Sequence, residues 1–215
     1  RAQGAGTRDG RTKVDGVSRT TIVRVMRVTV LGAGYMGSAM AEVAAMRGHD
    51  VRLWGTWLDD AMIAPVEEGK DHPRLKKKLH ARVKPMRSDT LAQALEGAEL
   101  VIHGVSSEGL VPVLTRAAPF LPDVPIASVT KGFLPAKSGR NERVDIVAAE
   151  VTGKKLRYVH AAGPAKAIEV ARSVLTWMFF ASEDIEDAKR AADALGGDHM
   201  RIQVSDDIAG AEICS

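Results

Sequence analysis

Three glycines, Gly32, Gly34 and Gly37, stand in the spacing GxGxxG within the sequence GAGYMG. In such a turn the first glycine permits a tight bend, the second lets the backbone approach a pyrophosphate, and the third allows a helix to pack closely on a strand. An apolar run at 25–31 precedes the turn and a helix-like segment at 38–47 follows it. Since the first amides of a helix attract phosphate, the spacing and its context predict a dinucleotide-binding turn.

The end of the next strand decides which dinucleotide fits. Proteins that bind NAD carry an acid about 20 residues past the glycines, where it accepts a hydrogen bond from the ribose 2′-OH. Here the strand end reads LWGT at 53–56, with neither an acid nor an arginine at its tip, and Asp59 and Asp60 lie further on. NAD and NADP both stay open, with a slight preference for NADP. A methyltransferase-like turn for an adenosyl cofactor is the less favoured alternative because it also needs an acid here.

Strand-like and helix-like segments alternate along the chain. Strands are predicted at 26–31, 51–54, 82–86, 100–105, 126–130, 157–161 and 174–180, and helices at 90–95, 109–120, 142–151, 166–172 and 183–195. This order predicts an α/β fold with a doubly wound, Rossmann-like, mostly parallel sheet. Ligands then bind at the carboxyl ends of the strands, in the loops that begin at Gly32, Gly55, Ser106, Lys131 and Ala162.

Lys131 follows a strand and precedes a glycine, so its ammonium should stand over the carboxyl edge of the sheet. It either binds an anionic substrate or polarises a carbonyl there, or it is a loop lysine in water. Ser106 and Ser107 either cap the next helix or contact the cofactor, and capping is the better interpretation. The six histidines show no metal-ligand spacing, so no metal site is predicted.

Composition excludes several classes of protein. The chain has 215 residues, is 45% hydrophobic and contains no apolar run near the roughly 20 residues that span a bilayer. The single cysteine, Cys214, cannot form an internal disulfide and suits a reducing compartment, so we expect a cytoplasmic protein without a membrane partner. The larger aromatic residues are assigned to packing; they are Trp54, Trp57, Trp177, Phe179 and Phe180.

The net charge of +3 is concentrated at the start of the chain. Residues 1–24 carry six basic and two acidic residues, which leaves the rest of the chain close to neutral. No nucleic-acid partner is therefore expected, and the lysine run 76–78 is interpreted as a solvated surface. Residues 1–25 are rich in Gly, Thr and Arg, begin with Arg rather than Met and lack hydrophobic periodicity, which predicts a disordered extension from upstream translation or cloning.

Four separated motifs carry a family resemblance: GAGYMGSAMA at 32–41, VTKGF at 129–133, AGPAKAIEVA at 162–171 and AEICS at 211–215. From Met26 to Ser215 the chain resembles the NAD(P)-dependent glycerol-3-phosphate dehydrogenases. The resemblance implies reduction of dihydroxyacetone phosphate to sn-glycerol 3-phosphate by NADH or NADPH, for glycerophospholipid synthesis. It also implies a small phosphate substrate and a homodimer in the full-length enzyme.

The resemblance further implies roles for individual positions. Cofactor contacts fall on Gly32, Gly34, Tyr35, Met36, Gly37, Thr56, Lys131 and Ala167, with Thr56 at a position that often holds a basic residue favouring NADPH. Substrate contacts fall on Lys131, Gly163 and Ala165, and Lys131 is also the catalytic residue assigned. Ala165 and Lys166 depart from the usual serine and phenylalanine, so Lys166 either attracts the substrate phosphate or points to solvent.

The family's acid–base lysine and its helical substrate domain would follow Ser215. We therefore expect residues 26–205 to form the dinucleotide-binding domain, residues 206–215 to begin the absent C-terminal helical domain, and the chain alone to be nearly inactive. Two alternatives stay open. One is a related reductase of the ketopantoate-reductase-like or hydroxyacid dehydrogenase type, and the other is a noncatalytic dinucleotide-binding module.

Overall fold

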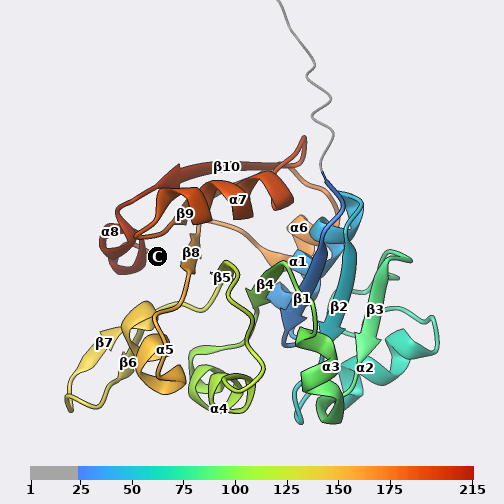
Figure 1. The fold of residues 1–215 in the computed structure, drawn as a ribbon. Helices are drawn as coiled ribbons and strands as arrows, with labels where there is room; N and C mark the ends of the chain where they lie inside the picture. Colours follow the sequence, from blue (N-terminus) through green and yellow to red (C-terminus); the bar gives the residue numbers. More distant parts are fainter. Residues whose placement is uncertain (1–23) are drawn as a thin grey trace, which may run out of the picture.

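The computed structural model describes residues 24–215 and places a single large sheet at its centre (Figure 1). The strands are β1 (Arg27–Leu31), β2 (Asp50–Trp54), β3 (Val83–Met86), β4 (Leu100–His103), β5 (Ile126–Ser128), β8 (Tyr158–Ala162), β9 (Thr176–Ala181) and β10 (Met200–Ser205). They lie in the order β10-β9-β8-β5-β4-β1-β2-β3, so β3 and β10 form the two edges. All pairs are parallel except β8 with β9. The predicted doubly wound, mostly parallel sheet is confirmed.

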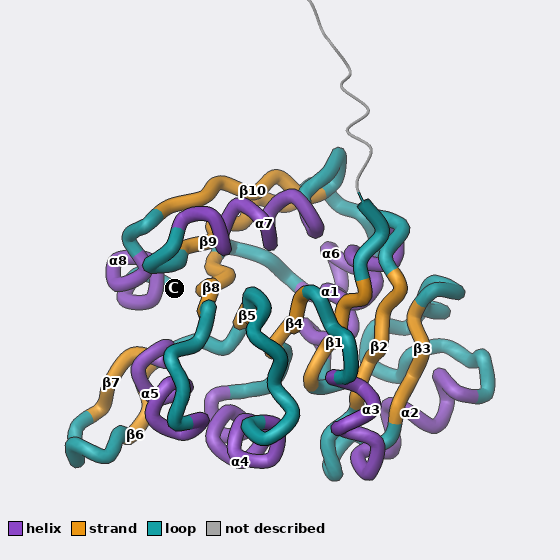
Figure 2. Tube along the Cα trace, viewed as in Figure 1, coloured by secondary structure: helices purple, strands orange, loops and turns teal. Residues whose placement is uncertain are grey.

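Helices connect the strands across both faces of the sheet. They are α1 (Tyr35–Met46), α2 (Asp60–Glu67), α3 (Leu91–Leu95), α4 (Ser107–Ala117), α5 (Val144–Thr152), α6 (Ala167–Ala171), α7 (Ile185–Leu195) and α8 (Ile208–Ile213). Two further strands, β6 (Phe133–Pro135) and β7 (Asn141–Arg143), form a separate antiparallel hairpin beside α5 (Figure 2). This hairpin and α2 are absent from the elements predicted above.

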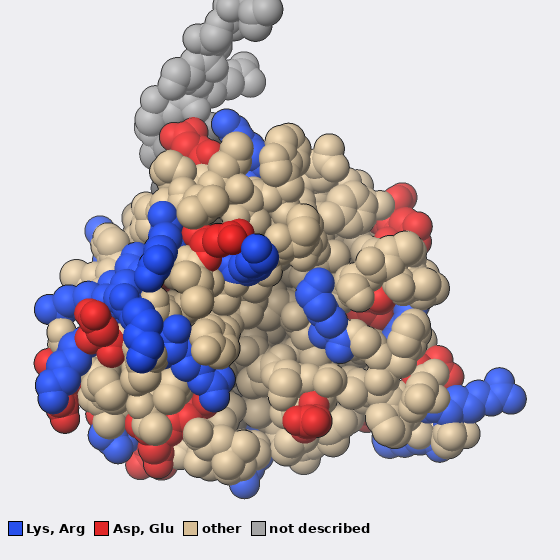
Figure 3. Space-filling view, turned by 180° about the vertical axis from the view of Figure 1, so that it is seen from behind, with Lys and Arg blue, Asp and Glu red and all other residues tan. Residues whose placement is uncertain are grey.

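Basic side chains gather on one end of the surface. In Figure 3 they lie at the left of the view, the side of β2, β3 and α2. The segment between α2 and β3 contributes Lys76 and Lys78, which are exposed as predicted. Lys77 differs, because its side chain is only 28% exposed and its Nζ lies 2.7 Å from Oε1 of buried Glu42. The prediction of a solvated run is therefore wrong for Lys77, which the fold uses as an internal ion-pair partner.

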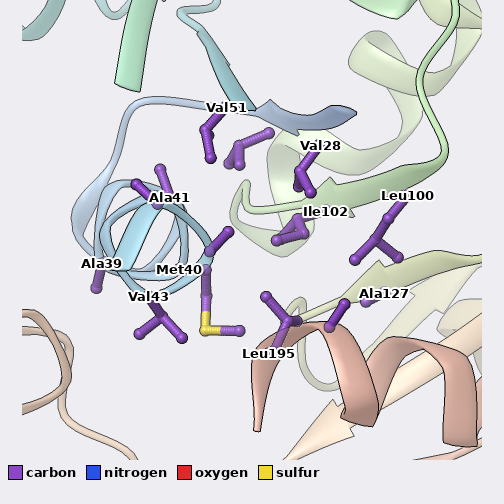
Figure 4. Packing of buried hydrophobic residues seen from close by; sticks show 14 of the residues in the cluster. Val28, Ala39, Met40, Ala41, Val43, Val51, Leu100, Ile102, Ala127 and Leu195 are labelled. Carbon is purple, nitrogen blue, oxygen red and sulfur yellow. The ribbon is translucent and has the colours of Figure 1, made fainter. Parts of the chain in front are cut away.

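The core is divided into two layers by the sheet. On one face α1 fits closely because small residues, Ala39, Ala41, Ala44 and Ala45, occupy its buried surface. Met40 of α1 lies with Ile102 of β4 and Leu195 of α7 in this layer (Figure 4). The other face holds Trp54 with side chains of α3, α4 and α5. Of the aromatic residues assigned to packing, Trp54 and Phe180 are fully buried, whereas Trp177 is 55% exposed and contradicts that assignment.

The structure covers the predicted domain boundaries only in part. The predicted disordered extension at 1–25 falls almost entirely on residues 1–23, which lie outside the described residues. Ile202 to Val204 lie within β10, and α8 follows β10. The boundaries proposed at 26–205 and 206–215 stay predictions.

Candidate cofactor and substrate site

The glycine turn lies where the strand order reverses, between β1 and its neighbours β2 and β4. Parallel sheets of this kind bind ligands in the crevice at such a switch point. Gly32 has φ of +104°, and a Cβ at this position would lie 2.6 Å from Val105 Cγ1. Gly32 also donates a backbone hydrogen bond to the Trp54 carbonyl at 2.8 Å. The turn therefore requires glycine for both its backbone conformation and its close contacts.

Gly37 and Gly104 bring α1 against the ends of β1 and β4. A Cβ on Gly37 would lie 2.1 Å from the Gly32 carbonyl oxygen, and a Cβ on Gly104 would lie 2.5 Å from the Gly37 Cα. The predicted packing role of Gly37 is consistent with this geometry. Sequence reasoning missed Gly104, although a glycine directly after an apolar strand is a signal of close backbone approach.

Gly34 differs from the other two glycines because its surroundings are open. The nearest atom to a Cβ at this position is Arg74 Nη1, at 3.7 Å. Gly34 is also the N-cap of α1, and because it has no side chain it offers no side-chain acceptor to the first helical amides. The open space beside Gly34 and the missing side-chain cap leave room at the start of α1 for a pyrophosphate.

Arg74 reaches this space from the loop between α2 and β3. Its guanidinium lies 5.2 Å from the centre of the Tyr35 ring, an arrangement of the cation–π type. Within the described residues it forms no ion pair. Sequence reasoning missed Arg74, because nothing in the local pattern at 71–74 shows that this loop folds back onto the glycine turn.

His72 holds the loop in that position. Its Nε2 lies 3.1 Å from the Ala33 carbonyl oxygen and 3.0 Å from Ser38 Oγ, and its Nδ1 accepts from the Leu75 amide at 3.3 Å. Burial lowers the pKa of His72, and nearby Arg74 acts in the same direction. A neutral ring suits these partners because Nδ1 must remain unprotonated to accept a hydrogen bond. His72 is therefore a structural support for the turn.

Asp59 connects the end of β2 to the glycine turn. Its Oδ2 accepts from the Thr56 amide and hydroxyl, both at 2.8 Å, and from the Ala33 amide at 3.2 Å. Thr56 is 7% exposed and its hydroxyl also accepts from the Leu58 amide at 3.3 Å. The predicted contact residue Thr56 thus lies beside the expected cofactor site with its hydroxyl already occupied, and the acid missing from the strand tip is present in space as Asp59.

Lys131 is exposed at the carboxyl edge of the sheet, as predicted. It lines a hollow of about 650 Å³ together with Gly163, Ala162 and Pro164 from the end of β8 and with residues around α8. Its ammonium has no hydrogen-bond or ion-pair partner within residues 24–215. An unpaired ammonium at the mouth of a hollow is well placed to attract an anion or to polarise a carbonyl.

The segment after β8 forms the other wall of this region. Gly163 has φ of +138°, and a Cβ there would lie 2.8 Å from the Trp177 carbonyl oxygen. Ala165 is half-buried and packs against the same core layer as α1, and Ala167 opens α6. Lys166 Nζ lies 3.2 Å from Glu169 Oε1, with its side chain 78% exposed. Lys166 thus faces solvent and pairs with Glu169, and a role in attracting the substrate phosphate stays a prediction.

A buried polar row lies under the carboxyl edge of the sheet. His103, Ser128 and His160 are in register on β4, β5 and β8, so their side chains share one face. His160 Nδ1 lies 3.4 Å from Oε1 of Glu212 on α8, which also accepts from the Asp145 amide at 3.2 Å. The row therefore attaches α8 to the sheet beside the hollow that Lys131 lines.

We expect acidification below pH 6.5 to weaken the fold through His103. Burial lowers its pKa to about 4, so between pH 6.5 and about 4 the unfolded chain binds more protons than the folded chain. The free energy of unfolding then falls by up to about 1.4 kcal/mol per pH unit from this residue. Burial also lowers the pKa of His49 and His72, which act in the same direction. Urea unfolding at pH 7, 6 and 5 measures the loss, and a His103→Gln variant should reduce its slope; equal stability at all three pH values would contradict it.

A sequence model described as the N-terminus of NAD-dependent glycerol-3-phosphate dehydrogenase matches residues 27–188. The chain belongs to this family. The family assignment made from the four motifs is confirmed. The match includes the glycine turn, Lys131 and the wall at 163–167, which are the regions described above.

Curated relatives agree with the family assignment. The chain is 34% identical over 190 residues to an NADP(+)-dependent glycerol-3-phosphate dehydrogenase of Archaeoglobus fulgidus, covering 88% of this chain and 56% of the relative. It is 36% identical over 190 residues to a glycerol-3-phosphate dehydrogenase [NAD(P)+] of Thiobacillus denitrificans, covering 87% and 56%. The chain therefore spans about half the length of these relatives.

Solved structures agree on the fold. The glycerol-3-phosphate dehydrogenase of Coxiella burnetii matches with a TM-score of 0.77 and 28% identity, over 88% of this chain and 57% of that one. A ketopantoate reductase of Ralstonia eutropha matches less well, with a TM-score of 0.60 and 18% identity, which shows the shared fold alone. Within residues 24–215, no helix combines the length and apolar character needed to cross a membrane. The same residues contain no cluster of three potential metal ligands among His, Cys, Asp and Glu.

Proposed function

We propose that this chain forms the cofactor-binding half of an enzyme that reduces dihydroxyacetone phosphate to sn-glycerol 3-phosphate with NAD(P)H. The observation that carries the proposal is the open space at Gly34, bounded by the first turn of α1 and by the guanidinium of Arg74, which forms no ion pair within residues 24–215. The match of residues 27–188 to the family supports it. A small phosphate substrate follows from the same assignment. The homodimer remains a prediction from the resemblance, and the cytoplasmic location remains a prediction from the composition.

The proposed reaction gives separate roles to the glycine turn at the start of α1 and to the residues around Lys131 and the end of β8. When bound, the reduced nicotinamide would supply a hydride to the substrate carbonyl carbon, and the carbonyl oxygen would take up a proton. Gly34, Tyr35 and Met36 would hold the pyrophosphate at the start of α1, with Gly32 and Gly37 shaping the turn. Lys131 would bind both cofactor and substrate and stabilise the negative charge that develops on the carbonyl oxygen. Gly163 and Ala165 would contact substrate, and Ala167 the nicotinamide side.

The experiment is a separate titration of the 215-residue chain with NADPH and with NADH, followed by fluorescence and calorimetry. Dihydroxyacetone phosphate is then added while the absorbance of the reduced cofactor is recorded. We expect binding of the cofactor without sustained oxidation, because the matched region covers about half of each relative. Failure to bind either cofactor would overturn the proposal. Sustained oxidation would instead show that this half of the relatives' length suffices for catalysis.

A noncatalytic dinucleotide-binding module is the second candidate. The coverage of about half of each relative favours it for the chain taken alone. A longer chain that includes a C-terminal region like that of the relatives distinguishes the two: oxidation by the longer chain supports the enzyme, and cofactor binding with no oxidation supports the module.

A further inference from the structure

A second arginine lies on an aromatic ring near the end of β2. The Arg116 guanidinium carbon, at the end of α4, lies 3.8 Å from the centre of the Trp57 ring. Trp57 directly follows Thr56, which Asp59 links to the glycine turn. Arg116 therefore reaches the β2 end from a distant helix, at the side of the crevice where the adenosine ribose of a dinucleotide lies.

Neither Thr56 nor Asp59 at the end of β2 offers a positive charge to that ribose. The Thr56 hydroxyl donates to Asp59 Oδ2 and accepts from the Leu58 amide, so both of its hydrogen-bonding roles are filled. Asp59 Oδ2 accepts three hydrogen bonds, which fixes the carboxylate as a support for the turn. Within the described part of the chain, Asp59 Oδ1 accepts no hydrogen bond. The charged groups that can face the ribose from here are therefore Asp59 Oδ1 and the Arg116 guanidinium.

The Arg116 guanidinium is available to an anion. The residue is exposed, and within residues 24–215 its guanidinium has no hydrogen-bond or ion-pair partner. Stacking on the half-buried Trp57 limits its rotation while leaving the N–H groups around its edge unfilled. A planar guanidinium held in this way matches the paired oxygens of a phosphate.

We infer that Arg116, supported by Trp57, binds the 2′-phosphate of NADP(H) and gives this chain its preference for that cofactor. The inference rests on the proposed function and assigns the specificity of its cofactor site to a side chain outside the β2 end itself. Arg74 has a different task, because its position beside Gly34 and Tyr35 places it near the pyrophosphate that both cofactors share.

The test compares Kd values of NADPH and NADH for the unmodified chain and for Arg116→Gln, Arg74→Gln and Arg190→Gln. Arg116→Gln should weaken NADPH binding about tenfold or more and change NADH binding less than about twofold. Arg74→Gln should weaken both cofactors to a similar extent. Arg190, exposed on α7 away from the crevice, is the matched control and should change neither. Circular dichroism and thermal unfolding of each variant confirm that its fold is retained.

Several outcomes would overturn the inference. One is a selective loss of NADPH binding in Arg74→Gln with none in Arg116→Gln, which would assign the 2′-phosphate to Arg74. Another is tighter binding of NADH than of NADPH by the unmodified chain, which would indicate that the ribose 2′-OH donates a hydrogen bond to Asp59. Equal loss of both cofactors in Arg116→Gln would also contradict it. Absence of binding by the unmodified chain would count against the proposed function itself.

Discussion

Replacing Gly37 by alanine should destabilise the folded chain by about 3 kcal/mol or more. The added Cβ would lie 2.1 Å from the Gly32 carbonyl oxygen and 3.2 Å from that of Gly104. Both contacts are with backbone, so neither can be relieved by a side-chain rotation, and α1 would have to move away from the sheet. Urea unfolding followed by circular dichroism measures the loss, and cofactor binding should fall with it.

Gly34→Ala is the matched comparison. Gly34 has φ of −75°, which alanine adopts without strain, and its Cβ would have 3.7 Å to the nearest atom. We expect its stability to change by less than about 1 kcal/mol, while cofactor binding weakens at least about tenfold because the methyl group takes the space of the pyrophosphate. Equal stability of Gly37→Ala and the unmodified chain would contradict the packing argument. Unchanged cofactor affinity in Gly34→Ala would contradict the site.

Replacing Lys77 by methionine should cost about 2 to 3 kcal/mol of unfolding free energy. The change leaves the Glu42 carboxylate buried, with its side chain 5% exposed, and without its charged partner. The expected loss lies toward the lower end for buried pairs because Lys77 is itself partly exposed. Lys77 Nζ also donates to the Ala171 carbonyl at 2.8 Å, so this one side chain links the loop at 71–80 to α1 and to the end of α6.

Lys78→Met is the control, since Lys78 belongs to the same run and is exposed. It should change stability by no more than about 0.5 kcal/mol. A second measurement uses the cofactor: because the loop carries Arg74, Lys77→Met should also weaken binding of NADPH and NADH in chains that remain folded. If Lys77→Met and Lys78→Met lower the free energy of unfolding equally, the ion pair between Lys77 and Glu42 does not stabilise the fold.

Local features of this molecule could be predicted from sequence, and contacts between distant segments could not. The glycine turn depends on six consecutive residues and the strand–helix alternation depends on short windows, so the place of the turn and most of the alternation could be predicted, whereas α2 and the hairpin of β6 and β7 could not. The antiparallel direction of β9 against β8 could not be predicted, because an apolar strand reads the same in either direction. Glu42 and Lys77 are 35 residues apart, and the exposed run around Lys77 resembles any solvated loop.

The candidate site shows the same division. Gly34 and Lys131 could be proposed from the sequence because a turn spacing and a strand end define their places. Arg74 and Arg116 could not, because each reaches the crevice through a fold contact, the first through His72 on the glycine turn and the second through Trp57. Asp59 stands between these cases, since the sequence contains the acid while only the structure shows its three hydrogen bonds at the end of β2.

The two edges of the sheet bear on how the chain behaves at high concentration. An edge strand presents unpaired backbone groups to which another copy can add, and this is a common route to aggregation. At one edge β3 carries exposed Lys84 next to Pro85, which has no amide hydrogen to donate. At the other edge β10 carries exposed Arg201. Charge at both edges and a missing donor at β3 hinder strand addition, so the open sheet is protected against growing into intermolecular β-structure.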